Sequence, residues 1–487
     1  MVSRPAAHRI TGVPRSAPLI PTVRSLPAAG CALLALAVTA CGGGVHGTPG
    51  GSGVRDPYFP KAGNSGYDVS HYALDLDYDP EARHLAGTAE ITARAGQDLS
   101  AFDLDLEGMD VEGVTVEGER ARWSRNGQEL VIRPHDDLDE GETFRITVRY
   151  CGTPRTLTDP DGSKEGWLPG AGGALALGEP TGSMAWFPGN HHPSDKASYD
   201  ISVTVPEKLQ VVSNGELADR STHGGRTTFH WRTAEPMAGY LATLAIGDYA
   251  IRRSTIPGAA GGGLPVLTAV APSQAAPARK VLARLPEIME WAEYNFGPYP
   301  FSSTGVIVAD EGTSDYALET QNRPVFPGAP STDLLVHELA HQWFGNSVTP
   351  KSWRDMWLNE GFATYAEWLW EEDNGGDSAQ ETFDALYDHG EDDHEDLWAF
   401  PPAEPSSAAH ISDSPVYERG AMVLHKIRQA VGDDAFYDIV QGWTAAHRHG
   451  NADTDDFTAY VEKKAPDEDF TSIWRDWLYG DGKPDRP

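Results

Sequence analysis

Two histidines four residues apart, followed by a glutamate, are the residues of this chain whose types and spacing could do chemistry. On a helix, His337 and His341 project from the same face one turn apart, so their imidazoles can converge on one metal ion. Glu338 is rotated by about 100° from His337, which lets it reach a water on the metal without being a ligand. A catalytic zinc takes three protein ligands, and Glu360 could supply the third. These residues predict a zinc hydrolase with Glu338 as its general base.

Three helical patterns are expected to position these residues. A helix over 331–345 carries both histidines, and the polar residues at its start are good N-cap chemistry. A second helix over 353–372 places Glu360 and Glu367 on one face. A third is expected over 417–431. The second half of the chain is therefore predicted to be mostly helical, with a small sheet.

The first half of the chain has a different periodicity. From about 56 to 249, apolar and polar residues alternate in short runs such as 71–79, and Gly, Asp and Pro turns separate the runs. This pattern predicts an antiparallel β sandwich or saddle, and hence an α+β multidomain protein. The Pro/Gly-rich stretch 257–263 is either the domain linker or a hairpin turn beside it. We place the N-terminal β domain at 56–262 and the catalytic domain at 263–487.

The N-terminus has the features of an export signal. Residues 1–40 carry four arginines and no acid, followed by the short apolar run 32–38. Small residues precede Cys41, which resembles a bacterial lipobox. We expect a signal peptide over 1–40, lipidation of Cys41, and a glycine-rich tether over 41–55. The protein is then a lipoprotein on the outer face of the bacterial cytoplasmic membrane, or, alternatively, a secreted protein. The true start codon could lie further in than Met1.

The cysteine content excludes an internal disulfide, and the net charge excludes nucleic acid as a partner. Of the three cysteines, Cys31 leaves with the signal peptide and Cys41 is lipidated, so only Cys151 remains and no internal disulfide can form. The formal net charge is -34, and loss of the four arginines makes it -38. Such a surface repels nucleic acid, which is excluded as a partner.

The residues around the histidines extend into a longer match. The run His-Glu-Leu-Ala-His-Gln-Trp-Phe-Gly-Asn at 337–346, followed by Trp-Leu-Asn-Glu-Gly-Phe-Ala at 357–363, resembles the aminopeptidase N family of zinc peptidases, relatives of thermolysin. By that resemblance one zinc ion is bound by three residues, namely His337, His341 and Glu360. Glu338 then polarises the zinc-bound water. Glu367, seven residues after Glu360, is expected to orient a ligand histidine.

The resemblance also implies recognition of a free α-amine by carboxylates. The family's Gly-x-Met-Glu-Asn loop corresponds to 316–321, where the glutamate is Glu319 but its neighbours depart from the pattern at Tyr316, Leu318 and Thr320. The segment Gly-Glu-Pro-Thr at 178–181 is similar to the second amine-binding segment and assigns Glu179 to the same role. His191 and His192 nearby are expected at the surface or the cleft rim, because the zinc site is complete without them.

The resemblance also implies an oxyanion donor and bears on the shape of the cleft. The segment Pro-Val-Tyr-Glu-Arg-Gly-Ala at 415–421 resembles the family segment whose tyrosine hydrogen-bonds the tetrahedral intermediate, here Tyr417. Family members carry a further helical domain over the cleft, whereas this chain ends at Pro487. We expect a more open cleft that admits longer peptides, weakens exopeptidase selectivity, or is compensated by a dimer.

Three functions remain in competition. The leading one is a membrane-tethered zinc aminopeptidase that acts on peptides outside the cytoplasm. A thermolysin-like zinc endopeptidase would share the chemistry without amine recognition, so cleavage of N-acetylated peptides distinguishes it. A non-catalytic, lipid-anchored peptide-binding protein would be expected to have lost a ligand, Glu338 or Tyr417, and all of these are present.

Overall fold

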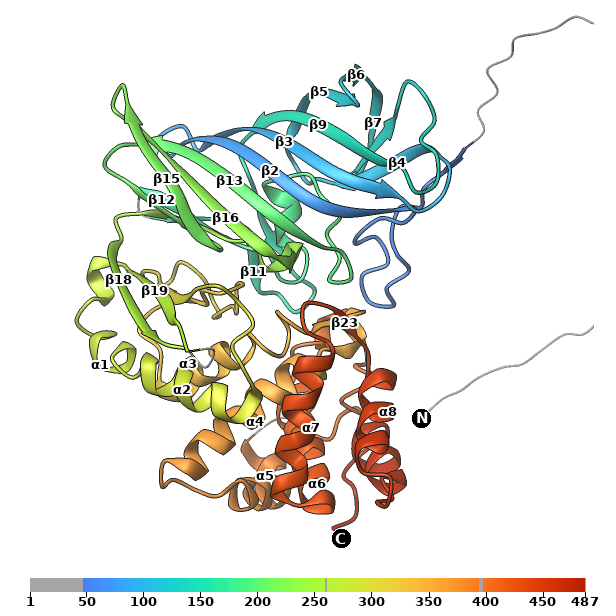
Figure 1. Ribbon diagram of the computed structural model, residues 1–487, viewed down its shortest axis with the longest axis vertical. Helices are drawn as coiled ribbons and strands as arrows, with labels where there is room; N and C mark the ends of the chain where they lie inside the picture. The colour runs from blue at the N-terminus through green and yellow to red at the C-terminus, as the bar shows by residue number, and fades with distance from the viewer. Residues whose placement is uncertain (1–46, 171, 259–260, 394–396, 487) are drawn as a thin grey trace, which may run out of the picture. The chain divides into compact units, whose positions relative to one another are not determined.

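The computed structural model describes residues 47–170, 172–258, 261–393 and 397–486 (Figure 1). The predicted signal peptide, Cys41 and the first residues of the predicted tether lie outside the described residues. Within the described ranges, no helix is both long enough and apolar enough to cross a bilayer.

Residues 47–55, which we predicted to be part of a free tether, are joined to the β half. The short strand β1 (Thr48–Pro49) pairs in parallel with β4 (Leu99–Asp105). The Thr48 amide donates a 2.9 Å hydrogen bond to the Asp98 carbonyl. The prediction was wrong here because an open sheet edge offers unpaired backbone groups that a neighbouring segment can satisfy.

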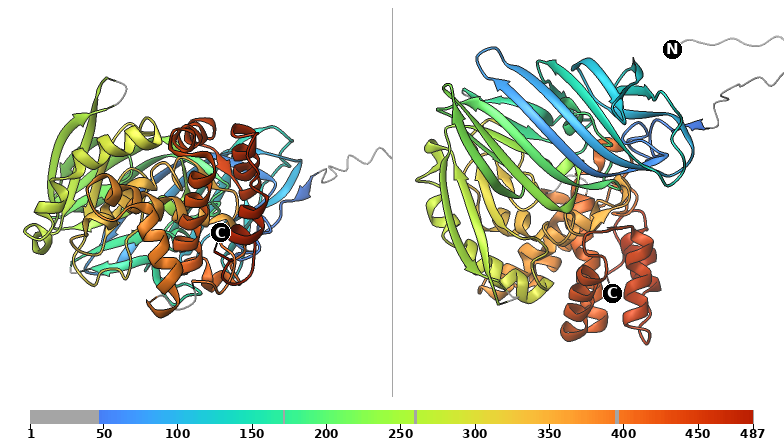
Figure 2. Two further views of the ribbon diagram at one scale, coloured as in Figure 1. Left: turned by 90° about the horizontal axis from the view of Figure 1, so that it is seen from below. Right: turned by 45° about the horizontal axis from the view of Figure 1, so that its top comes forward.

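The first half is built of β-strands, as the alternating pattern predicts, and within the described residues these strands form three sheets. In β2, Leu74 and Leu76 are buried while Asp75 and Asp77 are exposed. Neighbouring strands of the largest sheet are antiparallel except β13 and β2, and Figure 2 shows its twist. This sheet has the order β15 (Glu216–His223), β16 (Arg226–Ala238), β13 (Lys196–Pro206), β2 (Tyr67–Asp79), β3 (His84–Ala95), β9 (Thr143–Gly152), β5 (Asp110–Val116), β6 (Glu119–Arg120). The others run β1, β4, β8 (Glu129–Arg133), β7 (Arg122–Asn126), and β10 (Thr156–Thr158), β11 (Lys164–Gly170), β12 (Gly173–Leu177), β17 (Leu244–Gly247), β14 (Gln210–Ser213).

The catalytic half begins one strand earlier than predicted. Strand β18 (Ala250–Pro257) pairs antiparallel with β19 (Gly263–Val270), so the Pro/Gly-rich stretch connects a hairpin. Both strands belong to a sheet with β20 (Thr304–Val308) and β21 (Val325–Phe326). A domain boundary at 262/263 would split this sheet, and the structure moves it to about Tyr249. Gly and Pro mark a tight turn as readily as they mark a linker.

The three predicted helices occur in the predicted order, as α3, α4 and α6, and the described part of this half contains further helices (Figure 1). Helix α3 is shorter than expected, because after Ala340 the amides of Gln342 and Trp343 bond three residues back instead of four, and the turns end at Gly345 with a φ of +117°. The α-helices are α1 (Arg279–Leu282), α2 (Leu285–Phe296), α3 (Thr332–Ala340), α4 (Trp357–Asp373), α5 (Ala379–Asp393), α6 (Gly420–Val431), α7 (Asp433–Ala446) and α8 (Thr454–Lys464). Shorter elements are the 3₁₀ turn Trp353–Asp355, the π-helical turns Pro415–Arg419 and Ile473–Leu478, and the paired strands β22 (Thr349–Pro350) and β23 (Asn451–Ala452).

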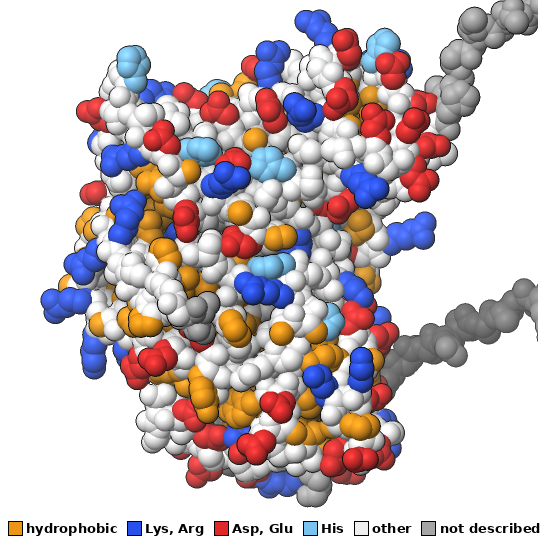
Figure 3. All heavy atoms as spheres, in the orientation of Figure 1, with side chains coloured by type: hydrophobic (Ala, Val, Ile, Leu, Met, Phe, Trp, Pro, Cys, Tyr) orange, Lys and Arg blue, Asp and Glu red, His pale blue; other side chains and the backbone are white. Residues whose placement is uncertain are grey.

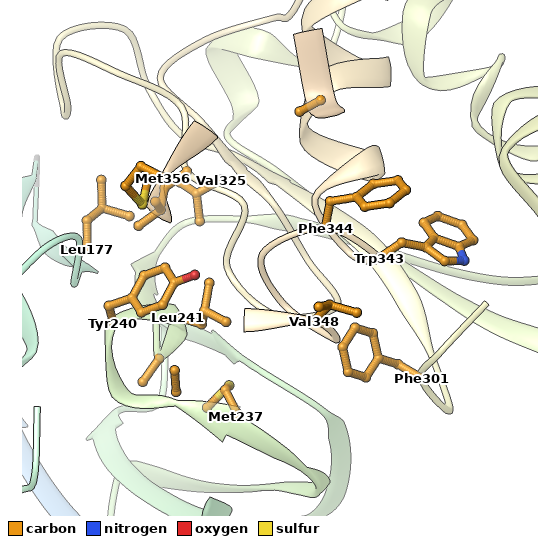
Figure 4. Packing of buried hydrophobic residues seen from close by; sticks show 14 of the residues in the cluster. Leu177, Met237, Tyr240, Leu241, Phe301, Val325, Trp343, Phe344, Val348 and Met356 are labelled. Carbon is orange, nitrogen blue, oxygen red and sulfur yellow. The ribbon is translucent and has the colours of Figure 1, made fainter. Parts of the chain in front are cut away.

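Apolar residues of both halves share one hydrophobic core (Figure 4). Tyr240, from the β half, packs edge-on against Trp353 with ring centroids 5.1 Å apart. The Tyr240 hydroxyl also donates to the Gly345 carbonyl at 3.3 Å. The two halves are therefore held together immediately beside the turn that follows His341.

Candidate active site

The two histidines and Glu360 meet as the sequence predicts. His337 Nε2 and His341 Nε2 lie 3.1 and 3.3 Å from the same carboxylate oxygen, Glu360 Oε2. All three side chains are buried, and their ligand atoms lie within 4.8 Å of one another. Two imidazole nitrogens and one carboxylate oxygen are the donor set of a catalytic zinc, and the group fits one zinc ion.

Electrostatics keeps Glu360 in the charge state that a metal-binding carboxylate needs. Burial alone raises the pKa of Glu360, but the imidazoles of His341 and His337 outweigh it and lower this pKa to about 2. Glu360 is therefore an ionised acceptor at neutral pH, as metal binding requires.

Two helices place these ligands. The Ser331 side chain caps α3 by accepting a 3.1 Å hydrogen bond from the Leu334 amide. Helix α4 carries Glu360 and lies close to the start of α6 at two glycines, where a Cβ on Gly361 would stand 2.9 Å from the Gly420 carbonyl carbon. A side chain at either glycine would push the helices apart, so this contact sets the depth at which Glu360 enters the site.

Each histidine is held through its second ring nitrogen. His337 Nδ1 donates a 2.6 Å hydrogen bond to Glu367 Oε1, and His341 Nδ1 donates one of 3.0 Å to the Phe344 carbonyl. Both bonds leave Nε2 facing Glu360. Glu367 was among the predicted site residues. The Phe344 carbonyl was not, because a backbone acceptor leaves no signal in the sequence.

Glu338 and Tyr417 line the same cavity as the ligands. Glu338 Oε2 is buried and has no hydrogen-bond partner among the described residues, and burial raises the pKa of Glu338 to about 8. The Tyr417 ring stacks on His337 at 6.0 Å with an angle of 10°. Burial raises the pKa of Tyr417 well above its ordinary value, so the phenol stays protonated and can donate.

Glu179 and Glu319, from opposite halves of the chain, also reach this site. Together with Glu360 they form a second group, in which one oxygen of each residue lies within 4.8 Å of the others. The Oε1 atoms of Glu179 and Glu319 lack a hydrogen-bond partner in the part of the chain that the structure describes. Burial, and then the charges of Glu319 and Glu360, raise the pKa of Glu179 well above its usual range. A cation placed between these carboxylates would relieve their repulsion.

The loops that carry these glutamates are braced by groups that sequence reasoning missed. Gln342 Nε2 and Asn346 Nδ2 both donate to the Glu319 carbonyl, at 3.1 and 2.6 Å. Tyr316, which departs from the expected motif, donates from its hydroxyl to the Glu179 carbonyl at 3.3 Å. Gln342 and Asn346 stand in the quoted motif, but only the folded chain shows what they hold.

The prediction for His191 and His192 was wrong. Both side chains are 3% exposed. His191 Nε2 donates to the Phe187 carbonyl at 3.0 Å, and His192 Nε2 lies 3.3 Å from Asp56 Oδ2. They are core residues with hydrogen-bond partners, which is why they could be buried.

Family models match both halves. Residues 68–241 match the "Peptidase M1 N-terminal domain" and residues 313–477 the "Peptidase family M1 domain". The chain belongs to the peptidase M1 family. Among solved structures, an M1 zinc metallopeptidase from Deinococcus radiodurans is 30% identical, with a TM-score of 0.81 over 89% of this chain and 98% of that one. A mutant of that enzyme bound to a Tyr-Ser-Ala substrate is 29% identical, with a TM-score of 0.82 over 89% and 99%.

Curated M1 relatives are longer proteins. "Probable aminopeptidase 2" of Sulfurisphaera tokodaii is 29% identical over 60% of this chain and 39% of its own length. "Glutamyl aminopeptidase" of Bos taurus is 27% identical over 61% of this chain and 33% of its own length. This chain spans less than half the length of each of these two relatives.

Proposed function

We propose that this M1 protein is a zinc aminopeptidase that removes N-terminal residues from peptides, exported and anchored by a lipid on Cys41 to the outer face of the bacterial cytoplasmic membrane. One observation carries the exopeptidase assignment. The paired carboxylates of Glu179 and Glu319 lie beside Glu360, with oxygens of all three within 4.8 Å. A substrate amine held there leaves room for only one residue before the scissile bond.

Zinc, when bound by His337, His341 and Glu360, supplies a Lewis acid that makes water nucleophilic near neutral pH and polarises the scissile carbonyl. Residues of the chain carry out the proton transfers. Glu338 Oε2 takes the proton of the attacking water and returns it to the leaving amine. The positive charge of a bound zinc ion would lower the pKa of Glu338 and keep its carboxylate ionised. Its Oε2 has no hydrogen-bond partner within the described residues and is free to accept this proton.

Tyr417 and the amine-binding pair complete the mechanism. The Tyr417 hydroxyl donates to the carbonyl oxygen as negative charge develops on it. Glu179 and Glu319 accept hydrogen bonds from the substrate ammonium, and their Oε1 atoms are the unpartnered acceptors available for this. The names of the longer relatives and the Tyr-Ser-Ala complex of the Deinococcus enzyme support the same substrate class.

Aminoacyl fluorogenic amides, compared with their N-acetylated counterparts, test the proposal. We expect free amines to be cleaved, acetylated substrates to resist, a chelator to abolish turnover and zinc to restore it. Glu319→Gln should lower kcat/KM on free amines by about 100-fold, a loss of ~2.7 kcal/mol. Glu311→Gln removes an exposed carboxylate on the same connection and serves as control. Equal cleavage of acetylated peptides would identify an endopeptidase, and binding without turnover a non-catalytic module.

The location is tested separately by labelling a bacterial host with a fatty-acid analogue. We expect the wild-type chain to carry the label and to sediment with membranes. A Cys41→Ser variant should lose both properties. Release of unlabelled wild-type protein into the medium would support the secreted alternative.

A further inference from the structure

The cavity that holds the zinc-ligand group, about 270 Å³ in volume, continues past the amine-binding carboxylates to the β10–β11 connection. That connection contributes Asp159, Asp161 and Ser163 to its wall. No Lys or Arg of the described residues lines it. On the protein face in Figure 3, by contrast, acidic and basic side chains are interspersed. The cavity therefore holds more carboxylates than zinc binding, catalysis and amine recognition use.

Asp159 is the unusual member of this wall. It is 8% exposed, and its Oδ1 is buried without a hydrogen-bond partner among the described residues. Nearby Glu165 is also buried, but it accepts bonds from the Thr181 amide and hydroxyl and the Gly182 amide at 2.7–3.0 Å. Glu165 thus braces the Glu179 segment, whereas Asp159 Oδ1 bonds to no group of the described residues. A buried, unpaired carboxylate is costly unless a cation or a proton joins it.

Asp159 lies on the amine side of the cavity. Burial is the main reason that the pKa values of Glu179 and Tyr316 lie well above their usual ranges, and the charge of Asp159 adds to both. Tyr316 in turn is bonded to the Glu179 carbonyl. A side chain on the residue whose amine sits between Glu179 and Glu319 therefore has Asp159 within its surroundings.

We infer that Asp159, with Asp161 at the outer end, forms the subsite for the side chain of the substrate's first residue, and that this subsite selects arginine and lysine. The inference rests on the proposed aminopeptidase function. Asp161 is exposed and is held by Ser163, whose amide and hydroxyl donate to its Oδ1 at 2.8 and 2.7 Å. The methylene stem of the substrate residue packs on Tyr316 and Ile411, and its cationic head meets the two aspartates.

The charge pattern of such a substrate matches that of the wall. An N-terminal arginine or lysine carries two positive groups, of which the α-amine occupies Glu179 and Glu319. A neutral first residue would leave the Asp159 carboxyl desolvated and unpaired. Discrimination should therefore be strongest against uncharged side chains of the same length.

Amides of arginine and citrulline, and of lysine and 2-aminoheptanoic acid, form two pairs with side chains of equal length for the test. We expect wild-type kcat/KM to favour the charged member by about tenfold or more, which is ~1.4 kcal/mol. Asp159→Asn should reduce both ratios by at least fivefold, Asp159→Glu should retain part of them, and Asp161→Asn should reduce them less. Glu207→Gln, an exposed carboxylate of the β half outside this cavity, should keep the wild-type ratios.

Calorimetric binding of free L-arginine and L-citrulline to the zinc-loaded chain gives a readout that does not depend on turnover. Tighter binding of arginine that is lost in Asp159→Asn, with an unchanged melting temperature, supports the subsite. Equal binding of the two amino acids, or ratios near one while leucine amide is still cleaved, overturns it and leaves the aminopeptidase function intact. Absence of cleavage of every amide overturns the aminopeptidase function instead. A calcium-induced switch to acidic first residues would show that Asp159 holds a divalent cation, and also overturns the inference.

Discussion

The side-chain amide of Asn346 donates a 2.6 Å hydrogen bond to the backbone carbonyl of Glu319. Asn346 ends the motif that begins with the two histidines, and Glu319 is one of the carboxylates that we propose to bind the substrate amine. Gln342 donates to the same carbonyl at 3.1 Å. The segment that carries the two histidines thus also holds the loop of Glu319, so the proposed metal site and the proposed amine site are joined by these two hydrogen bonds.

Replacing Asn346 by alanine tests this connection. Gln342 would still satisfy the Glu319 carbonyl, so we expect the fold to survive and the loop to lose its fixed position. The expected result is a rise in KM for free-amine substrates of about tenfold, ~1.4 kcal/mol, with zinc content unchanged. Steady-state kinetics together with metal analysis checks it. An unchanged KM would mean that Gln342 alone holds the loop.

Glu338→Gln separates metal binding from proton transfer. Glutamine keeps the size of the side chain but cannot accept the proton of the attacking water. We expect one zinc per chain to remain while kcat falls by about 10³-fold or more, ~4 kcal/mol. Single-turnover kinetics on a fluorogenic amide measures the loss. Near-normal turnover would remove Glu338 from the role of general base.

The sequence was sufficient for the parts of the site that depend on helix geometry. The spacing of His337 and His341 on one helix puts them on a common face. The spacing of seven residues between Glu360 and Glu367 puts both on the same side of α4. The same reasoning could not find the Phe344, Glu179 and Glu319 carbonyls as acceptors, because every residue has a carbonyl. It also misplaced the start of the catalytic sheet at a glycine-rich turn, since turns and linkers share a composition.

The sequence also did not reveal which polar residues are buried. His192 was expected near the surface, but its partner Asp56 stands 136 positions earlier, and the pair is only recognisable once the chain has folded. The burial of Asp159 was also not evident from the sequence. Nothing in its local sequence distinguishes it from a turn carboxylate, whereas the structure shows it buried without a partner.

Glu367→Gln is predicted to weaken zinc binding. The charge of Glu367 makes its 2.6 Å bond to His337 Nδ1 stronger and His337 a better ligand. We expect zinc affinity to fall by about 10–100-fold in a competition titration with a chelator, while kcat at saturating zinc changes less. Glu371→Gln, one turn further along α4 and exposed, is the matched control. Equal affinities of the two variants would contradict a positioning role for Glu367.

Gly361→Ala should destabilise the catalytic half. The added Cβ would stand 2.9 and 3.0 Å from the Gly420 carbonyl carbon and Cα, which are backbone atoms that cannot rotate away. We expect a loss of about 1–3 kcal/mol in the free energy of unfolding, measured by urea denaturation. Gly262→Ala meets no atom within 4 Å and should change it by less than about 0.5 kcal/mol. A neutral Gly361→Ala would show that α4 and α6 can separate without cost.

Asp56 gives a pH-dependent stability whose sign follows from its contacts. Its Oδ2 accepts hydrogen bonds from the Trp353 amide and the Ser352 hydroxyl at 2.9 and 2.8 Å, which joins the start of the β half to the turn before α4. Burial raises the pKa of Asp56, but hydrogen bonds from His192, Phe59, Trp353 and Ser352 outweigh this and lower it to about 2 from 3.8.

Because the folded-state pKa is depressed, the contribution is complete above about pH 4 and is lost as the pH falls towards 2; the shift corresponds to about 2 kcal/mol. We expect Asp56→Asn to be less stable than wild type by about this amount at pH 7, and the two unfolding curves to converge between about pH 4 and 2. Asp75→Asn, on the exposed face of β2, controls for the loss of one surface charge. A gap between Asp56→Asn and wild type that stayed constant down to pH 2 would show that the hydrogen bonds do not depend on the ionised carboxylate.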